Sequence, residues 1–166
     1  MKVLVDGVDV SQSEYARKRI LLDTVILCYA HDLLSPYHGE ASLIVKASIN
    51  GLIEAYVSYQ NLVEFYSVMT GPRVKNPLSP REAAELCALY ERSVAVGKLL
   101  PDIAAYSEAF ESAKDLSIVS GEVFDCVLAL TARGKVDTIW TENTRHFKRY
   151  AFLNAENPLV WKWKEE

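Results

Sequence analysis

Apolar positions follow two different spacings along the chain, and each spacing predicts one kind of secondary structure. Short continuous apolar runs predict buried strands, because a strand that is covered on both faces needs no polar side. Longer stretches repeat apolar residues every three to four positions, as one face of an amphipathic helix does. The predicted strands cover residues 20–22, 55–57, 98–100 and 136–140, and the predicted helices cover residues 25–34, 41–53, 61–69, 79–96, 103–115 and 125–133.

Residues 79–96 carry the clearest helix signals. Ser79 is a favoured N-cap, Pro80 suits the first helical position, and Glu82 stands where the acid of a capping box would be. Because strands and helices alternate along the chain, the sequence predicts an α/β architecture, with a short-stranded, mainly parallel central sheet flanked by helices. Such sheets bind ligands beyond the carboxyl ends of their strands.

The two ends of the chain depart from this alternation. Residues 1–19 predict an N-terminal extension or a small hairpin, because Asp6 and Gly7 between two β-branched runs favour a tight turn. Residues 20–150 are expected to form the main domain. Residues 151–166 predict a C-terminal strand or a tail that packs on the same domain.

Composition limits the class of protein. With 166 residues, of which 50% are hydrophobic and 24% charged, the chain can bury one sizeable core and is expected to be a single domain. Lys and Arg number 18 against 22 Asp and Glu, so the net charge is −4 and no bulk positive field attracts nucleic acid. A phosphate-bearing partner therefore needs a local basic patch or a metal ion.

Cysteine usage and hydropathy bear on the compartment. Cys28, Cys87 and Cys126 are odd in number and stand in apolar settings, which fits free thiols in a reducing compartment better than a disulfide framework. No apolar run approaches the ~20 residues that a membrane helix requires, and the first residues are too polar for a signal peptide. We therefore expect a cytoplasmic protein with no membrane segment.

Three acidic residues stand where structure alone explains them poorly. Asp23 closes the first strand of the predicted sheet, Glu64 lies on an apolar helix, and Asp125 stands at the entrance of another. Each has an ordinary alternative, because Asp is a natural helix N-cap and Glu64 can pair with a neighbouring Arg or Lys. If the three converge, their repulsion calls for a divalent cation, and ligation by oxygen alone favours Mg²⁺ or Mn²⁺ over Zn²⁺.

A polar segment, residues 141–147, follows the last clear strand at the same edge of the predicted sheet. It contains Arg145, and Lys148, Arg149 and Arg133 could add to a local patch that contacts phosphates. A surface turn with solvated charges is the alternative interpretation.

Four segments resemble, in order, the motifs of PIN domains, and in pattern those of VapC-type toxins. They are Leu21–Thr24, Gln60–Phe65, Phe124–Ala132 and Val136–Asn143, and the likeness spans roughly residues 20–150. The resemblance implies a PIN-like three-layer α/β fold. It also implies a metal-dependent endoribonuclease whose clustered acids hold Mg²⁺ or Mn²⁺.

Matched residue by residue, Asp23, Glu64 and Asp125 fall on the three principal acidic positions of the family, which are the implied metal ligands. The fourth position differs, because Asn143 stands where relatives commonly have an acid and supplies an oxygen without a charge. The implied catalytic residues are therefore these three acids and Asn143. Auxiliary contacts with metal or substrate are expected from Thr24, Thr141, Glu142, Arg145 and His146.

The resemblance implies an RNA substrate, an antitoxin protein and a homodimer as partners. It also implies that a metal-activated water attacks the phosphate, so that no protein nucleophile is needed. The sequence agrees, because it has no Gly-rich phosphate loop, no zinc spacing and no convincing Ser–His pair. The alternative is a non-catalytic PIN-like module that binds RNA or protein. A phosphoacceptor receiver domain fits less well, because such domains open with adjacent acids and Asp23 is followed by Thr24.

Overall fold

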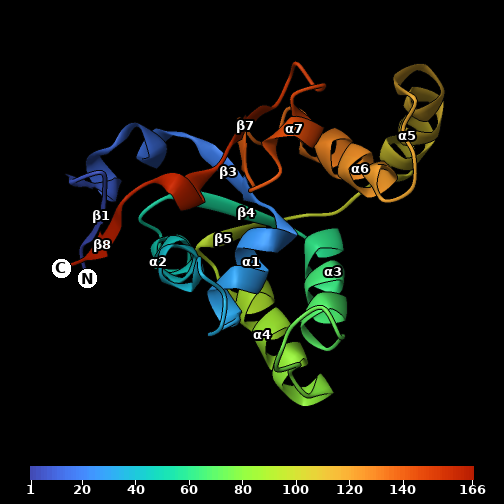
Figure 1. Cartoon of the computed structure of the whole chain (residues 1–166). Helices are drawn as coiled ribbons and strands as arrows, with labels where there is room; N and C mark the ends of the chain where they lie inside the picture. The colour runs from blue at the N-terminus through green and yellow to red at the C-terminus, as the bar shows by residue number, and fades with distance from the viewer.

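The computed structural model describes residues 1–166 and contains a central sheet of five parallel strands in the order β5-β4-β3-β6-β7 (Figure 1). Strand β3 lies in the middle, as a continuous apolar run requires, because neighbouring strands and helices cover all its sides. The strands are β3 (Arg19–Leu22), β4 (Glu54–Ser58), β5 (Val96–Leu99), β6 (Thr138–Trp140) and β7 (Asn154–Glu156). The predicted α/β fold is confirmed.

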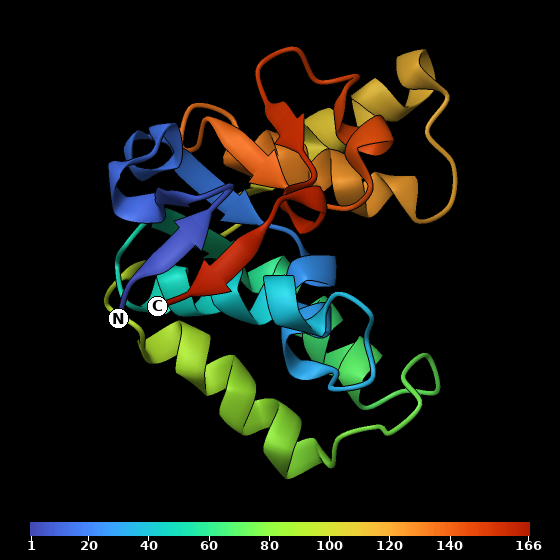
Figure 2. The same ribbon diagram turned by 60° about the vertical axis from the view of Figure 1, so that its left-hand side comes forward.

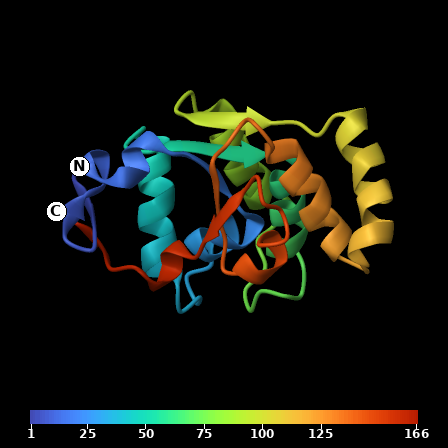
Figure 3. The same cartoon turned by 90° about the horizontal axis from the view of Figure 1, so that it is seen from above.

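Helices cover both faces of this sheet and make a three-layer structure (Figures 1 and 3). One face packs against α1, α2, α3 and α4, and the other packs against α5, α6 and α7. The helices are α1 (Thr24–His31), α2 (His38–Ile49), α3 (Tyr59–Met69), α4 (Pro80–Arg92), α5 (Ile103–Leu116), α6 (Glu122–Ala132) and α7 (Thr144–Phe147).

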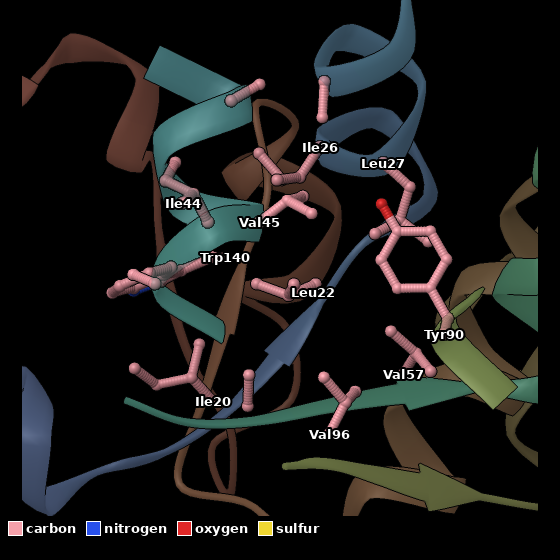
Figure 4. Close-up of a cluster of buried hydrophobic side chains, with 14 of the residues drawn as sticks. Ile20, Leu22, Ile26, Leu27, Ile44, Val45, Val57, Tyr90, Val96 and Trp140 are labelled. Atoms are coloured by element: carbon pink, nitrogen blue, oxygen red, sulfur yellow. The ribbon is translucent and has the colours of Figure 1, made fainter. Parts of the chain in front are cut away.

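The alternation of side chains along β3 divides the core into two clusters. Ile20 and Leu22 point to the larger cluster, in which Tyr90 of α4 and Trp140 of β6 are fully buried (Figure 4). Leu21 points the opposite way, into the smaller cluster formed with α5, α6 and α7. Successive residues of a strand face opposite sides of a sheet, so one apolar run fills both cores.

Helix α4 begins as the capping signals predict. The Ser79 side chain accepts a hydrogen bond from the Glu82 amide, and the Glu82 carboxylate accepts one from the Ser79 amide at 2.8 Å. The predicted end at residue 96 is wrong, because the helix ends at Arg92 and Val96 pairs with Ala55 in the sheet. The apolar spacing typical of a helix continues from α4 into β5, so the sequence pattern does not mark the end of the helix.

The two ends of the chain meet in a second, three-stranded antiparallel sheet of order β2-β1-β8 (Figure 2). Asp6 and Gly7 have φ of 50° and 83°, as a two-residue hairpin turn requires. The strands are β1 (Val3–Val5), β2 (Val8–Asp9) and β8 (Trp163–Glu165), and the 3₁₀ segments are Val10–Gln12, Glu14–Arg17 and Pro158–Val160. Division of the chain after residues 19 and 150 stays a prediction.

Two polar segments contain regular structure that the sequence did not assign to the central sheet, which was predicted from residues 20–22, 55–57, 98–100 and 136–140. Strand β7 lies within residues 154–158, and helix α7 lies within residues 141–147. Both follow β6, and Thr141 donates its amide to the Glu156 carbonyl at 2.9 Å, so the two segments support each other. None of the helices has both the length and the apolar character needed to cross a membrane.

Candidate active site

A cavity of about 580 Å³ opens beyond the carboxyl ends of β3 and β6. Four separate elements deliver its polar wall: the start of α1, the middle of α3, the first turn of α6 and the segment after β6. Among the residues that line it are Asp23, Glu64, Asp125, Glu142 and Asn143. The residues that the sequence places far apart therefore share one cavity.

Asp23 follows the last residue of β3 and is the N-cap of α1. Its Oδ1 accepts a hydrogen bond from the Thr24 amide at 2.7 Å, and its Oδ2 accepts one from the Thr141 hydroxyl at 2.6 Å. Burial, together with the negative charges of Asp125 and Glu64, raises the pKa of this carboxyl to about 6, although the hydrogen bonds from Thr141 and Thr24 act in the opposite direction. Asp23 is therefore the cap of α1 through Oδ1 and also lines the cavity, so capping does not exclude a role in the site.

Glu64 is half-buried on α3 and is held by neutral donors. The Thr24 hydroxyl donates to its Oε2 at 3.0 Å, and the Gln60 amide donates to its Oε1 at 2.9 Å. Gln60 also donates to the carbonyl of Phe124 at 2.9 Å, which ties α3 to α6. The ordinary alternative, pairing with Arg or Lys, does not occur, because no ion pair includes Glu64.

Asp125 lies inside the first turn of α6 and not at the helix entrance as the sequence suggested, since α6 begins at Glu122 with Gly121 as its N-cap. N-capping therefore does not explain this acid. Its Oδ2 lies 2.7 Å from Nδ1 of His146 on α7. Burial raises the pKa of Asp125, and the hydrogen bond with His146 partly offsets that rise. His146, which the sequence suggests as an auxiliary contact with metal or substrate, is thus the hydrogen-bond partner of Asp125.

The segment after β6 supplies the rest of the expected set. The Thr141 hydroxyl, which donates to Asp23, also accepts a hydrogen bond from the backbone amide of Asn143 at 3.0 Å. The side-chain Nδ2 of Asn143 lies 2.9 Å from Nδ1 of His146. Glu142 is exposed at the cavity wall and accepts the Tyr29 hydroxyl at 2.6 Å. Arg145 is also exposed but does not line the cavity.

The donor set suits a hard divalent cation. Asp23, Glu64 and Asp125 present carboxylate oxygens to one cavity, and the charges of Glu64 and Asp125 raise the pKa of Asp23, a repulsion that a cation would relieve. The nearby Cys28 thiol offers no thiolate, because burial raises its pKa to about 12. In their present positions no three His, Cys, Asp or Glu side chains converge on one point, so binding of one ion by all three acids would require these side chains to move closer together.

Sequence reasoning missed several residues that line the cavity or hold the acids in it. Gln60 holds Glu64, Tyr29 holds Glu142, and Asp32 and Arg73 line the cavity wall. Gln60 stands four residues before Glu64, which places both on one helix face, and that spacing was the available signal. Arg73 lies on the connection between α3 and α4, where no periodicity indicates the direction of a side chain.

No protein-family model and no curated protein sequence matches the chain. Solved structures do match the chain. They show a PIN-like α/β fold, which matches VapC and FitB PIN-domain toxins over most of the chain at low sequence identity. The resemblance and the fold class predicted from the sequence are thereby confirmed.

Three of these structures illustrate the match. VapC20 of Mycobacterium tuberculosis, described as a sarcin-ricin loop cleaving toxin, is 13% identical with a TM-score of 0.62, over 79% of this chain and 95% of its own. VapBC2 of Rickettsia felis, bound to promoter DNA, is 17% identical with a TM-score of 0.58, over 86% and 98%. FitAcB of Neisseria gonorrhoeae is 20% identical with a TM-score of 0.53, over 85% and 99%. At these identities the likeness establishes the fold.

Proposed function

We propose that this protein is a Mg²⁺- or Mn²⁺-dependent endoribonuclease, with Asp23, Glu64 and Asp125 as metal ligands and Asn143 as the fourth catalytic residue. The observation that carries the proposal is that three carboxylates from separate elements line one cavity, where Asp23 and Glu64 are held by neutral donors alone. Neither helix capping nor pairing with Arg or Lys accounts for Glu64 and Asp125.

The side chains around the acids have distinct tasks in this proposal. When bound, the cation supplies an activated water and polarises the scissile phosphate. Thr141 and the Thr24 amide fix the carboxylate of Asp23, and Thr24 and Gln60 fix that of Glu64. Such outer partners set the orientation of a metal ligand and strengthen its binding.

The remaining polar residues complete the proposed site. His146 fixes one oxygen of Asp125 and leaves the other for the cation. Asn143 supplies a carbonyl oxygen, Glu142 adds negative charge at the cavity wall, and the exposed Arg145 contacts RNA outside the cavity.

The proposal extends to partners. Structures similar to this chain were crystallised as VapBC and FitAB complexes. We infer that this chain is the toxin of a toxin-antitoxin pair, that it acts on RNA in the cytoplasm, and that a small antitoxin protein and a second copy of the chain bind it.

The test is cleavage of RNA by purified Asp23→Asn and Asp125→Asn variants in Mn²⁺. Each variant is expected to cleave at least about 100-fold more slowly than the wild type, since loss of even an outer partner of a metal ligand costs about 10- to 100-fold. Asp137→Asn is the matched control, because this acid precedes β6 at the opposite end of the sheet. Cleavage at the wild-type rate by both site variants would refute the proposal.

A second candidate is a non-catalytic module that binds RNA or a protein. Two observations favour it: Asn143 replaces an acid, and the present side-chain positions bring no three ligands together. Retained RNA or partner binding, with no Mn²⁺ binding at millimolar concentration, would identify such a module.

A further inference from the structure

The candidate cavity has an unusual charge balance for a site that receives RNA. Five carboxylates line it, from Asp23, Asp32, Glu64, Asp125 and Glu142, and a single cationic side chain, Arg73, does so. A phosphodiester that enters such a cavity meets negative charge on nearly every wall. One divalent cation offsets two of these charges. A further cationic group at the cavity would reduce the remaining repulsion between the carboxylates and the phosphodiester.

Arg73 is placed for that task. It is exposed, and no ion pair or hydrogen bond of its side chain occurs in the structure, although five acids line the same cavity. Other arginines, Arg19, Arg133 and Arg149, each pair with a carboxylate. The guanidinium of Arg73 therefore keeps all its donors available.

The backbone that carries Arg73 is fixed even though its side chain is free. The next residue, Val74, is buried in the larger core cluster. Further along the same connection, the Leu78 amide donates to the Met69 carbonyl at 2.8 Å and closes the segment onto the end of α3. The chain thus holds Arg73 beside the cavity without using its charge for folding.

We propose that Arg73, the one cationic side chain that lines the acidic cavity, binds a backbone phosphate of single-stranded RNA next to the scissile bond. This inference rests on the proposed function and names a substrate contact within it. The planar guanidinium matches two phosphate oxygens at once, which a lysine ammonium does not. Lys75 provides the comparison, because it lies on the same connection, is exposed, and does not line the cavity.

The experiment compares Arg73→Ala, Arg73→Lys and Lys75→Ala with the wild type. Binding of a short fluorescent single-stranded RNA is measured by anisotropy in EDTA, which prevents metal-dependent cleavage, at several NaCl concentrations. Arg73→Ala is expected to weaken binding about tenfold, the value of one charge-assisted hydrogen-bonded contact. It should also reduce the slope of log Kd against log salt by about 0.7, the share of one phosphate contact on a single strand. Lys75→Ala should change neither quantity.

A second readout separates binding from folding and from chemistry. In Mn²⁺, Arg73→Ala should raise KM with little change in kcat, as loss of a ground-state contact does, and Arg73→Lys should recover part of the loss. Thermal unfolding of all three variants should match the wild type, because Arg73 makes no contact that folding needs.

Each outcome bears on one of the two proposals. If the wild type cleaves RNA and Arg73→Ala behaves like Lys75→Ala in both affinity and salt slope, the role of Arg73 is overturned. If the wild type binds RNA through Arg73 but does not cleave it, the proposed nuclease activity fails, the contact of Arg73 with an RNA phosphate stands, and its place beside a scissile bond is overturned. If the wild type neither binds nor cleaves RNA, both are overturned.

Discussion

At the amino end of the central sheet, Asp137 precedes β6 and meets Arg19 of β3, with Arg19 Nη2 2.8 Å from Asp137 Oδ1 and Nε 3.1 Å from Oδ2. At the carboxyl end, Asp23 follows β3 and receives only the Thr24 amide and the Thr141 hydroxyl. Hydrogen bonds from Arg19 lower the pKa of Asp137, whereas burial raises the pKa of Asp23 to about 6. The same two strands thus neutralise a carboxylate at one end and leave one without a cation at the other.

This difference shows which end of the sheet is arranged for stability. A half-buried carboxylate without a cation costs free energy. An Asn at position 23 could cap α1 through its carbonyl oxygen, and its NH2 group could donate to the Thr141 hydroxyl oxygen, without the cost of a buried charge. Asp137 already has its cation and gains nothing from a metal. The ion pair with Arg19 accounts for the charge of Asp137, whereas no contact within the fold accounts for the charge of Asp23, as expected if the cavity binds a cation.

The largest expected effect on stability comes from removing the charge at position 23. In metal-free protein, Asp23→Asn should become more stable than the wild type as pH rises, by up to about 3 kcal/mol at pH 7, because the pKa is raised by about two units. The folded-state pKa lies above the unfolded value, so the stability that neutral Asp23 contributes is present below pH 3.8 and is lost as pH rises through about 6. Urea unfolding in EDTA at pH 3.5 to 7.5 measures this difference.

The difference between variant and wild type is the quantity to compare, because other groups titrate in the same range. Burial lowers the pKa of His31 to about 4, so His31 destabilises the protein as pH falls, and this opposes the effect of Asp23. Both proteins carry His31, and the subtraction removes it. If the difference in unfolding free energy between variant and wild type stays constant with pH, the pKa of Asp23 is not raised by its surroundings.

A smaller effect is expected at the partner of Asp125. His146→Ala removes the group that holds Asp125 Oδ2 and should weaken Mn²⁺ binding about 10-fold, within the range measured for outer partners of metal ligands. Lys148→Ala is the control, since Lys148 is exposed near the end of α7 and lies outside the cavity. Equal Mn²⁺ affinity of the two variants would show that His146 does not support metal binding by Asp125.

The smallest effect, of opposite sign, is expected at the amino end of the sheet. Asp137→Asn should destabilise the protein at pH 7 by less than about 1 kcal/mol, because the ion pair with Arg19 is exposed and screened by water. Asp137 has a lowered pKa, so its contribution is present above pH 3.8 and is lost as pH falls. If Asp137→Asn stabilises the protein at pH 7, the carboxylates at the two ends of the sheet do not differ in their effect on stability, contrary to what we expect.

Much of the fold was predictable because its signals are local. The capping box of Ser79 and Glu82 and the apolar run of β3 depend on neighbours in sequence, and both occur as predicted. Strand β7 was missed because its residues, Asn154–Glu156, are mostly polar, as an edge strand permits. Its pairing with β6 is set by the tertiary structure and leaves no periodic pattern.

The site was predictable where residue type alone marks it. Asp23, Glu64 and Asp125 stood out as acids in apolar surroundings, and they line one cavity. The orientation of Asp125 within α6 was not predictable, because Glu122 and Asp125 both stand near the start of the helix and either could begin it. Arg73 was not predictable either, since only the tertiary fold brings its connection to the cavity.

Isothermal titration of Mn²⁺ into the metal-free wild type and into Asp23→Asn tests the central claim most directly. We expect a saturable heat for the wild type, corresponding to about one or two ions per chain, and loss of that heat in the variant, because a carboxylate supplies the charge that hard cations require. Identical heats for the two proteins at millimolar Mn²⁺ would contradict the claim that these acids are kept without a cation in order to bind one.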